Sequence, residues 1–142
     1  MNPLVTYFSR RGDTRKVAEV MAKELGCSAI DLKKERPDVS NIDLLVVGSG
    51  TYGGKPGSEI VSFLCEIPSV TGKRAALFAT CSSGTVPWFE SMRGVLESKG
   101  YQVCGCFSCF GQIFFSRRGH PTAEELAKAA EFAVQLKWGA SL

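Results

Sequence analysis

The sequence predicts an α/β domain in which helices cover both faces of a five-stranded parallel sheet. Five short apolar runs lack a polar and apolar alternation, which is typical of strands buried on both faces. Amphipathic segments with helical spacing separate most of these runs. The 142 residues suit a single domain spanning 1–142. Because crossovers between parallel strands are right-handed, we expect the doubly wound strand order 2-1-3-4-5.

The first half of the chain supplies three of the expected strands and two of the helices. Val17, Val20, Met21 and Leu25 recur at helical spacing, and Gly26 ends that helix. In chain order, we expect strand 4–8, helix 15–25, strand 27–32, strand 44–48 and a second long helix over 60–67.

The second half supplies the last two strands and two more helices. In chain order, we expect strand 74–79, helix 88–96, strand 101–107 and a final helix that begins after residue 122. Thr122 can cap the final helix, and Glu125 stands three positions on to complete a capping box. The Phe- and Gly-rich stretch up to residue 118 has no clear period, so we expect a loop there, or a continuation of the strand.

The composition is that of an ordinary globular protein. Hydrophobic residues make up 44% of the chain, charged residues make up 22%, and the net charge is +3. Basic residues are interspersed with acidic ones, which disfavours binding of nucleic acid. No apolar run approaches the ~20 residues of a membrane span, and the amino terminus lacks the features of a signal peptide. We therefore expect a cytoplasmic protein without membrane insertion.

The six cysteines are expected to be free thiols in a reducing compartment. Cys104, Cys106 and Cys109 are close enough in sequence to suggest a metal site. In a regular strand, however, Cys104 and Cys106 share a face while Cys109 has the opposite parity. Since no matched second Cys/His pair follows, the sequence does not favour a metal centre.

Polar loops follow the first, third and fourth expected strands, and they contain Ser9, Gly50 and Thr80. The carboxyl ends of parallel strands meet at one edge of a sheet, and ligands bind there at the point where the strand order reverses. We therefore expect the three loops to form one ligand cleft.

The loop after the third strand contains two misleading motifs. Gly48, Gly50 and Gly53 satisfy the dinucleotide fingerprint G-x-G-x-x-G. That motif, however, follows a first strand, whereas here Pro56 places the helix start after all three glycines and no acidic residue ends the next strand. A P-loop is also excluded, because Pro56 follows Lys55 where a Ser or Thr is required.

The loop after the first strand has the composition of an anion site. Ser9 and Thr14 supply hydroxyl groups immediately before a helix, whose free N–H groups and positive dipole end favour phosphate. Arg10 and Arg11 add positive charge. The alternative is that Asp13 or Ser9 only caps the helix and that the arginines are solvated.

Three segments resemble the flavodoxin family. Its phosphate loop and first helix, with the usual pattern Ser/Thr-x-Thr-Gly-Asn-Thr, are similar to residues 7–19 (Tyr-Phe-Ser-Arg-Arg-Gly-Asp-Thr-Arg-Lys-Val-Ala-Glu). Its second flavin loop resembles residues 43–56 (Asp-Leu-Leu-Val-Val-Gly-Ser-Gly-Thr-Tyr-Gly-Gly-Lys-Pro). The carboxyl end of its short members resembles residues 119–126 (Gly-His-Pro-Thr-Ala-Glu-Glu-Leu).

This resemblance implies a noncovalently bound FMN. The phosphate would lie on the first loop, and the isoalloxazine ring would lie between the second and third loops. Tyr52 is the candidate for stacking on or beside the ring, and the alternative is a loop tyrosine packed on protein. The implied cofactor-binding residues are Ser9, Arg10, Arg11, Gly12, Asp13, Thr14, Gly50, Thr51, Tyr52, Gly53, Gly54, Thr80, Cys81, Ser82, Ser83 and Gly84.

The chain departs from the family pattern at two positions and in its charge. Arg11 stands where threonine is usual, which removes a hydroxyl but offers a charge-assisted bond to phosphate. Asp13 stands where asparagine is usual, and its carboxylate would repel a phosphate dianion unless Arg11 or Arg15 neutralises it. The pI near 8.6 differs from the acidic surfaces usual for flavodoxins.

Four further side chains can be considered as functional residues, and none of them indicates catalysis. Trp88 and Phe89 begin a helix, and we expect them in the core. His120 precedes a helix cap and lacks a catalytic constellation, so we expect a structural or solvent-facing role. Cys81 could touch a flavin, but nothing nearby in the sequence indicates an activated thiolate.

The resemblance implies an electron carrier that serves redox partner proteins, which the sequence does not identify. The alternative is an enzyme of the same fold: an FMN-dependent NAD(P)H or quinone reductase, or a relative of the protoporphyrinogen oxidases. Asp13 motivates a further alternative, a protein of flavodoxin shape that has lost its flavin. A receiver-type signalling domain is excluded, because Gly48 and Ser49 stand where its phosphorylatable aspartate would be.

Overall fold

The computed structural model describes residues 1–111 and 120–139. Its five strands are parallel and form one sheet in the order β2-β1-β3-β4-β5, which confirms the predicted fold class. In chain order the elements are β1 (Pro3–Phe8), α1 (Asp13–Leu25), β2 (Ala29–Asp31), β3 (Leu44–Gly50), α2 (Ser58–Glu66), β4 (Lys73–Cys81), α3 (Trp88–Ser98), β5 (Tyr101–Phe110) and α4 (Ala123–Lys137). Within the two described ranges, no helix has both the length and the apolar character needed to cross a bilayer.

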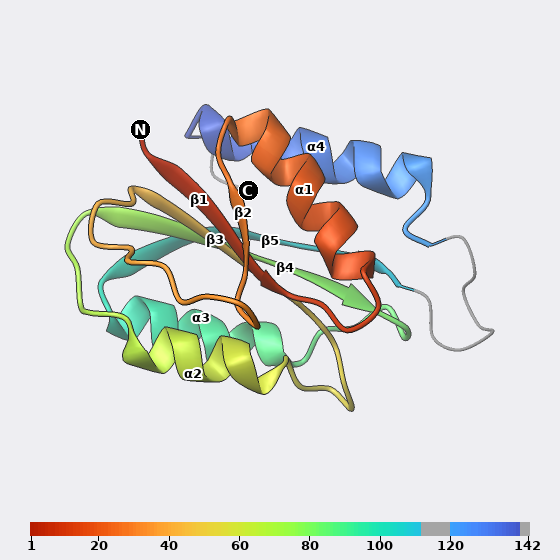
Figure 1. The fold of residues 1–142 in the computed structure, drawn as a ribbon, viewed down its shortest axis with the longest axis horizontal. Helices are drawn as coiled ribbons and strands as arrows, with labels where there is room; N and C mark the ends of the chain where they lie inside the picture. The colour runs from red at the N-terminus through yellow and green to blue at the C-terminus, as the bar shows by residue number, and fades with distance from the viewer. Residues whose placement is uncertain (112–119, 140–142) are drawn as a thin grey trace.

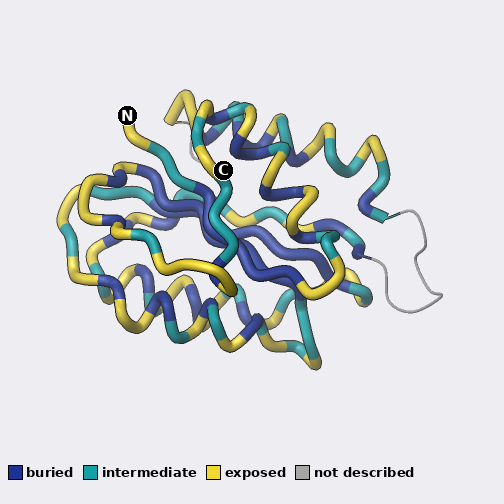
Figure 2. Tube along the Cα trace, viewed as in Figure 1, coloured by how far each residue is buried: buried dark blue, intermediate teal, exposed yellow. Residues whose placement is uncertain are grey.

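The sheet lies between two layers of helices (Figure 1). Helices α1 and α4 cover one face and pack on side chains such as Val46 and Phe78. Helices α2 and α3 cover the other face, where Val47 and Leu77 contribute to a second core. Every residue of β3 is buried, as the dark central strands of Figure 2 show. Burial on both faces explains why the apolar strands do not alternate with polar residues.

Three strands extend further toward their carboxyl ends than the sequence predicted. Strand β3 continues to Gly50, β4 to Cys81 and β5 to Phe110. The added residues are held by ladder pairs, with Gly50 opposite Thr80 and Cys81 opposite Phe110. Thr80 therefore lies within β4 and does not begin a loop. The rest of the Phe- and Gly-rich stretch, residues 112–119, lies outside the described residues.

A β-bulge at Cys104 overturns one expectation about the cysteines. Val103 pairs with Ala75, but the next residue of β4 pairs with Gly105, so Cys104 is an extra residue in the strand. Cys104 and Cys109 therefore face the α1 and α4 layer. Cys106 lies instead within the electrostatic reach of Glu90 and Arg93 on α3. The prediction that Cys104 and Cys106 share a face was wrong, because it assumed a regular strand.

The start of α4 confirms the predicted capping box. Thr122 Oγ1 accepts a hydrogen bond from the Glu125 N–H at 3.1 Å, and Glu125 Oε1 accepts one from the Thr122 N–H at 2.9 Å. The cap fixes the point where the chain enters α4, next to the carboxyl end of β5.

Candidate functional site

A cleft of about 650 Å³ opens at the carboxyl edge of the sheet. It lies where the connections after β1, β3 and β4 meet, as the strand order predicts. Its lining residues are Ser9, Arg10, Arg11, Asp13, Thr14, Gly50, Thr51, Tyr52, Gly53, Thr80, Cys81, Ser82 and Gly111. The structure thus brings most of the sequence-predicted residues together around one cavity.

Four of the predicted residues do not line this cleft. Gly12 is the N-cap of α1, and Gly54 lies against Pro87 beside a separate groove. Ser83 is exposed and shares a hydrogen bond with the Thr85 hydroxyl at 3.2 Å. Gly84 lines a smaller cavity between β5 and α4. The chain after Ser82 therefore turns away from the cleft.

Gly111 lines the cleft although the sequence did not point to it. A side chain at this position would lie 3.2 Å from both Asp13 Oδ2 and Thr80 Cβ, so glycine keeps the floor of the cleft open. The available signal was a glycine directly after the fifth strand. That signal could not be used, because the end of the strand had no clear period in the sequence.

The amino terminus of α1 forms one end of the cleft. Gly12 adopts a left-handed φ of 94°, which glycine tolerates best, and its N–H donates to Ser9 Oγ at 2.9 Å. This bond closes the turn after β1 and differs from a helix cap, in which the acceptor receives an N–H from the second or third helical residue. The N-cap residue itself offers no side chain to the first turn of α1.

Two buried hydroxyl groups lie under this helix end. Thr14 Oγ1 and Thr80 Oγ1 are 2.8 Å apart, which ties α1 to the carboxyl end of β4. Only one hydrogen lies between two bonded hydroxyl oxygens, so the pair retains a second hydrogen for another acceptor. With the positive end of the helix dipole, these groups form an environment that favours an anion.

Tyr52 and Arg10 form another part of the cleft wall. The Arg10 guanidinium carbon lies 4.0 Å from the centre of the Tyr52 ring, and Phe8 contacts the same ring edge-on at 5.8 Å. A side chain at Gly50 would come within 2.4 Å of the Tyr52 hydroxyl oxygen. Glycine at position 50 therefore makes room for the tyrosine. Burial raises the pKa of Tyr52, although the backbone N–H and the charge of Arg10 act in the opposite direction.

Two residues outside the predicted set support the loops of the cleft. Lys33 Nζ donates to the Ser9 carbonyl oxygen at 2.7 Å, which ties the segment after β2 to the loop after β1. Trp88 Nε1 donates to Thr51 Oγ1 at 3.0 Å. Trp88 is buried, as expected of a core residue, yet its indole nitrogen also positions a cleft residue. Neither role leaves a local pattern in the sequence.

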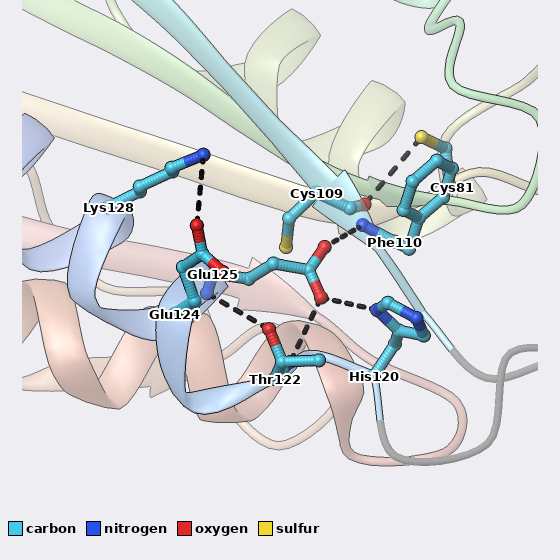
Figure 3. Close-up of polar contacts among 8 residues, drawn as sticks. All are labelled: Cys81, Cys109, Phe110, His120, Thr122, Glu124, Glu125 and Lys128. Atoms are coloured by element: carbon cyan, nitrogen blue, oxygen red, sulfur yellow. Dashed lines mark hydrogen bonds and ion pairs between the residues drawn. The ribbon is translucent and has the colours of Figure 1, made fainter.

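Glu125 joins β5 to α4 (Figure 3) and lines the smaller cavity between them. Its second carboxylate oxygen accepts from the Phe110 N–H at 2.9 Å, and its first contacts His120 Nδ1 as well as the Thr122 N–H. Burial raises the pKa of Glu125, but these N–H groups and His120 outweigh burial and hold the pKa below its usual value. Burial, followed by the charge of Glu125, raises the pKa of Cys109 to about 12.

Comparison with known proteins identifies the family. A family model described as "Flavodoxin domain" matches residues 4–117. The chain belongs to the flavodoxin family. It is 34% identical to an uncharacterized protein of Methanocaldococcus jannaschii, over 96% of this chain and 98% of the relative. It is 29% identical to a flavodoxin of Clostridium beijerinckii, over 70% of this chain and 78% of that flavodoxin.

Solved structures agree with the fold of this flavodoxin-family chain. The flavodoxin of Fusobacterium nucleatum bound to flavin mononucleotide superposes with a TM-score of 0.73, and the alignment covers 99% of both chains at 13% identity. The likeness confirms the architecture. The resemblance inferred from the three sequence segments is therefore confirmed at the level of family and fold.

Proposed function

We propose that this protein binds FMN noncovalently in the cleft and carries electrons between redox partner proteins. The observation that carries the proposal is that one cleft is lined both by an anion-favouring helix end and by an aromatic side chain. Membership of the flavodoxin family supports it, as do a relative named flavodoxin and a structural neighbour described with flavin mononucleotide.

The residues present suit the phosphate end of FMN. Arg11 lines the cleft together with Ser9 and Thr14, so the chain has a guanidinium where the family usually has a hydroxyl. The hydrogen retained by the Thr14 and Thr80 pair can be donated to a phosphate oxygen. Asp13 is the one carboxylate among the lining residues, and it opposes these groups.

The residues also suit the ring end. A volume of about 650 Å³ lies within the roughly 300–1,000 Å³ typical of small-molecule sites. Tyr52 presents an aromatic ring to the cleft, and Gly53 adds no side chain beside it. When bound, FMN supplies reversible electron transfer, while the chain binds and orients it and excludes water from the ring.

A titration with FMN and with riboflavin tests the proposal. Quenching of flavin fluorescence should show binding of FMN by the purified protein, and riboflavin should bind at least about tenfold more weakly because it lacks the phosphate. Substitution of Arg11 by Gln should weaken the binding of FMN and leave the affinity for riboflavin unchanged. Arg93→Gln is the matched control, because Arg93 lies on α3 and pairs with Glu97.

Two outcomes would change the assignment. Failure of FMN to bind the unmodified protein would overturn the proposal and favour a flavodoxin-shaped protein without flavin. Steady oxidation of NAD(P)H in the presence of a quinone by the pure FMN-loaded protein would instead favour the reductase alternative. A carrier should accept electrons once per bound FMN and should not turn over with this pair of substrates.

A further inference from the structure

Among the residues that the structure describes, Arg10 is the cation placed most closely on the aromatic wall of the cleft. The sequence grouped it with the phosphate-binding loop, but the structure turns its guanidinium onto the face of Tyr52, 4.0 Å from the ring centre. Its backbone N–H also acts to lower the pKa of Tyr52, against the larger effect of burial. Both Arg10 and Tyr52 line the cleft. The positive charge therefore stands at the end of the cleft that is proposed to hold the flavin ring.

The charges around Tyr52 can be ranked by their effect on the tyrosine. Arg10 exerts the largest single charge effect on Tyr52, and the effects of Asp13 and of Glu59, each smaller, act in the opposite direction. Lys33 is a second cation on this side, with its ammonium 5.7 Å from the centre of the Phe8 ring. Within residues 1–111 and 120–139, Arg10 is therefore the strongest single charge acting on Tyr52.

We propose that Arg10 raises the reduction potential of FMN bound in this cleft. The inference rests on the proposed function. Full reduction adds two electrons and one proton to the ring when the product is the anionic form, so the bound flavin gains one negative charge. The electrons come from a donor protein in the cell, or from dithionite in the test. A nearby guanidinium stabilises that added charge and makes the reduced form more favourable.

The size of the effect is limited by solvent. Arg10 is exposed, so water and salt screen its charge. We therefore expect Arg10 to favour the reduced over the oxidised cofactor by about tenfold, which equals ~30 mV for a two-electron couple. The effect should shrink as the ionic strength rises.

The test is a redox titration of the FMN-loaded protein against indicator dyes. Arg10→Gln should lower the two-electron midpoint potential by ~30 mV, equivalent to the tenfold change, and Arg10→Lys should retain part of the difference. Arg15→Gln is the matched control, because it removes the same charge from an exposed arginine that pairs with Glu19 on α1. This control should leave the potential unchanged.

Several results would overturn the inference. An unchanged or higher midpoint potential in Arg10→Gln would do so. An equal fall of the midpoint potential in Arg15→Gln would also do so, because the net charge of the protein, and not the position of Arg10, would then be responsible. An ultraviolet titration of tyrosine in the FMN-free protein gives an independent readout. Loss of Arg10 should raise the pH at which Tyr52 ionises, with Tyr52→Phe identifying its signal. Failure of FMN to bind would overturn the proposed function, while this titration would still decide whether Arg10 supplies the charge at Tyr52.

Discussion

The carboxylate of Asp13 has two opposing effects, one on the stability of α1 and one on ligand binding in the cleft. As the first residue of α1, its carboxylate interacts favourably with the positive end of the helix dipole, by roughly 0.3–1 kcal/mol. The same carboxylate lines the cleft, where it would repel a phosphate dianion. The carboxylate of Asp13 therefore stabilises the fold but weakens the binding of a phosphate.

Substitution of Asp13 by Asn should change FMN affinity and stability in opposite directions. FMN should bind about threefold to tenfold more tightly, because one repulsive charge near the phosphate is removed in a partly aqueous site. The free energy of unfolding should fall by about 0.5 kcal/mol as the dipole interaction weakens. Fluorescence titration and urea denaturation measure the two effects. Riboflavin affinity serves as the control and should not change, and unaltered FMN affinity would show that Asp13 is already neutralised by its neighbours.

Single residues also show where sequence reasoning reached its limit. Ser9, Thr14 and Tyr52 could be placed at the cleft because each follows a strand that ends at the same edge of the sheet. The reason for Gly50 could not be found in this way. The resemblance implied only that Gly50 binds the cofactor, whereas the structure shows that the tyrosine hydroxyl occupies the space that a side chain would need.

Helix α4 and strand β5 are joined by one carboxylate. Glu125 completes the capping box and also accepts the Phe110 N–H, so it fixes the relative position of the two elements. The capping box could be predicted from the spacing of Thr122 and Glu125 alone. The bond to Phe110 could not, because it depends on how far β5 extends, and the side-chain pattern did not show that.

The free energy of unfolding of Glu125→Gln should depend less on pH than that of the unmodified protein. The pKa of Glu125 is lowered in the folded protein, so the carboxylate stabilises the fold above its unfolded pKa near 4.5. This contribution is lost as the pH falls through the lowered folded pKa. Denaturation at pH 7 should show a loss of about 1–2 kcal/mol in the variant.

The same comparison at about pH 3 checks the sign of this effect. There the difference between Glu125→Gln and the unmodified protein should be smaller than at neutral pH. Glu124→Gln is the control, since Glu124 lies in the same helical turn but is largely exposed. A constant difference at both pH values would contradict the role assigned to the ionised carboxylate.

At the scale of the whole molecule, the layered architecture followed from composition and spacing because burial on both faces leaves a clear signature. Strand order and the location of the cleft then followed from the handedness of the crossovers. The path of residues 83–84 did not follow, because a polar turn beyond the end of a strand can fold toward either side. In the structure, Ser83 and Thr85 share a hydrogen bond in this turn and Gly84 adopts a left-handed φ of 83°.

Binding of FMN should stabilise the entire domain. The three loops of the cleft come from different parts of the chain, so a ligand that holds them binds the folded state and not the unfolded one. At free FMN about 100-fold above its dissociation constant, the gain should be about 2.7 kcal/mol. Thermal denaturation with increasing FMN measures it, with riboflavin at equal concentration as the weaker comparison. A melting temperature independent of FMN would argue against binding to the native protein.

The bulge in β5 has a consequence for how this protein tolerates changes in length. Cys104 has no partner in the ladder. The residues on both sides of it, Val103 and Gly105, pair with the consecutive residues Ala75 and Ala76 of β4. Deleting Cys104 would therefore leave Phe107 against Phe132 and would cost mainly the packing of one thiol. Deleting Ser108 would instead turn Cys109 to the opposite face. Insertions and deletions in this strand should be accepted at position 104 and rejected a few residues later.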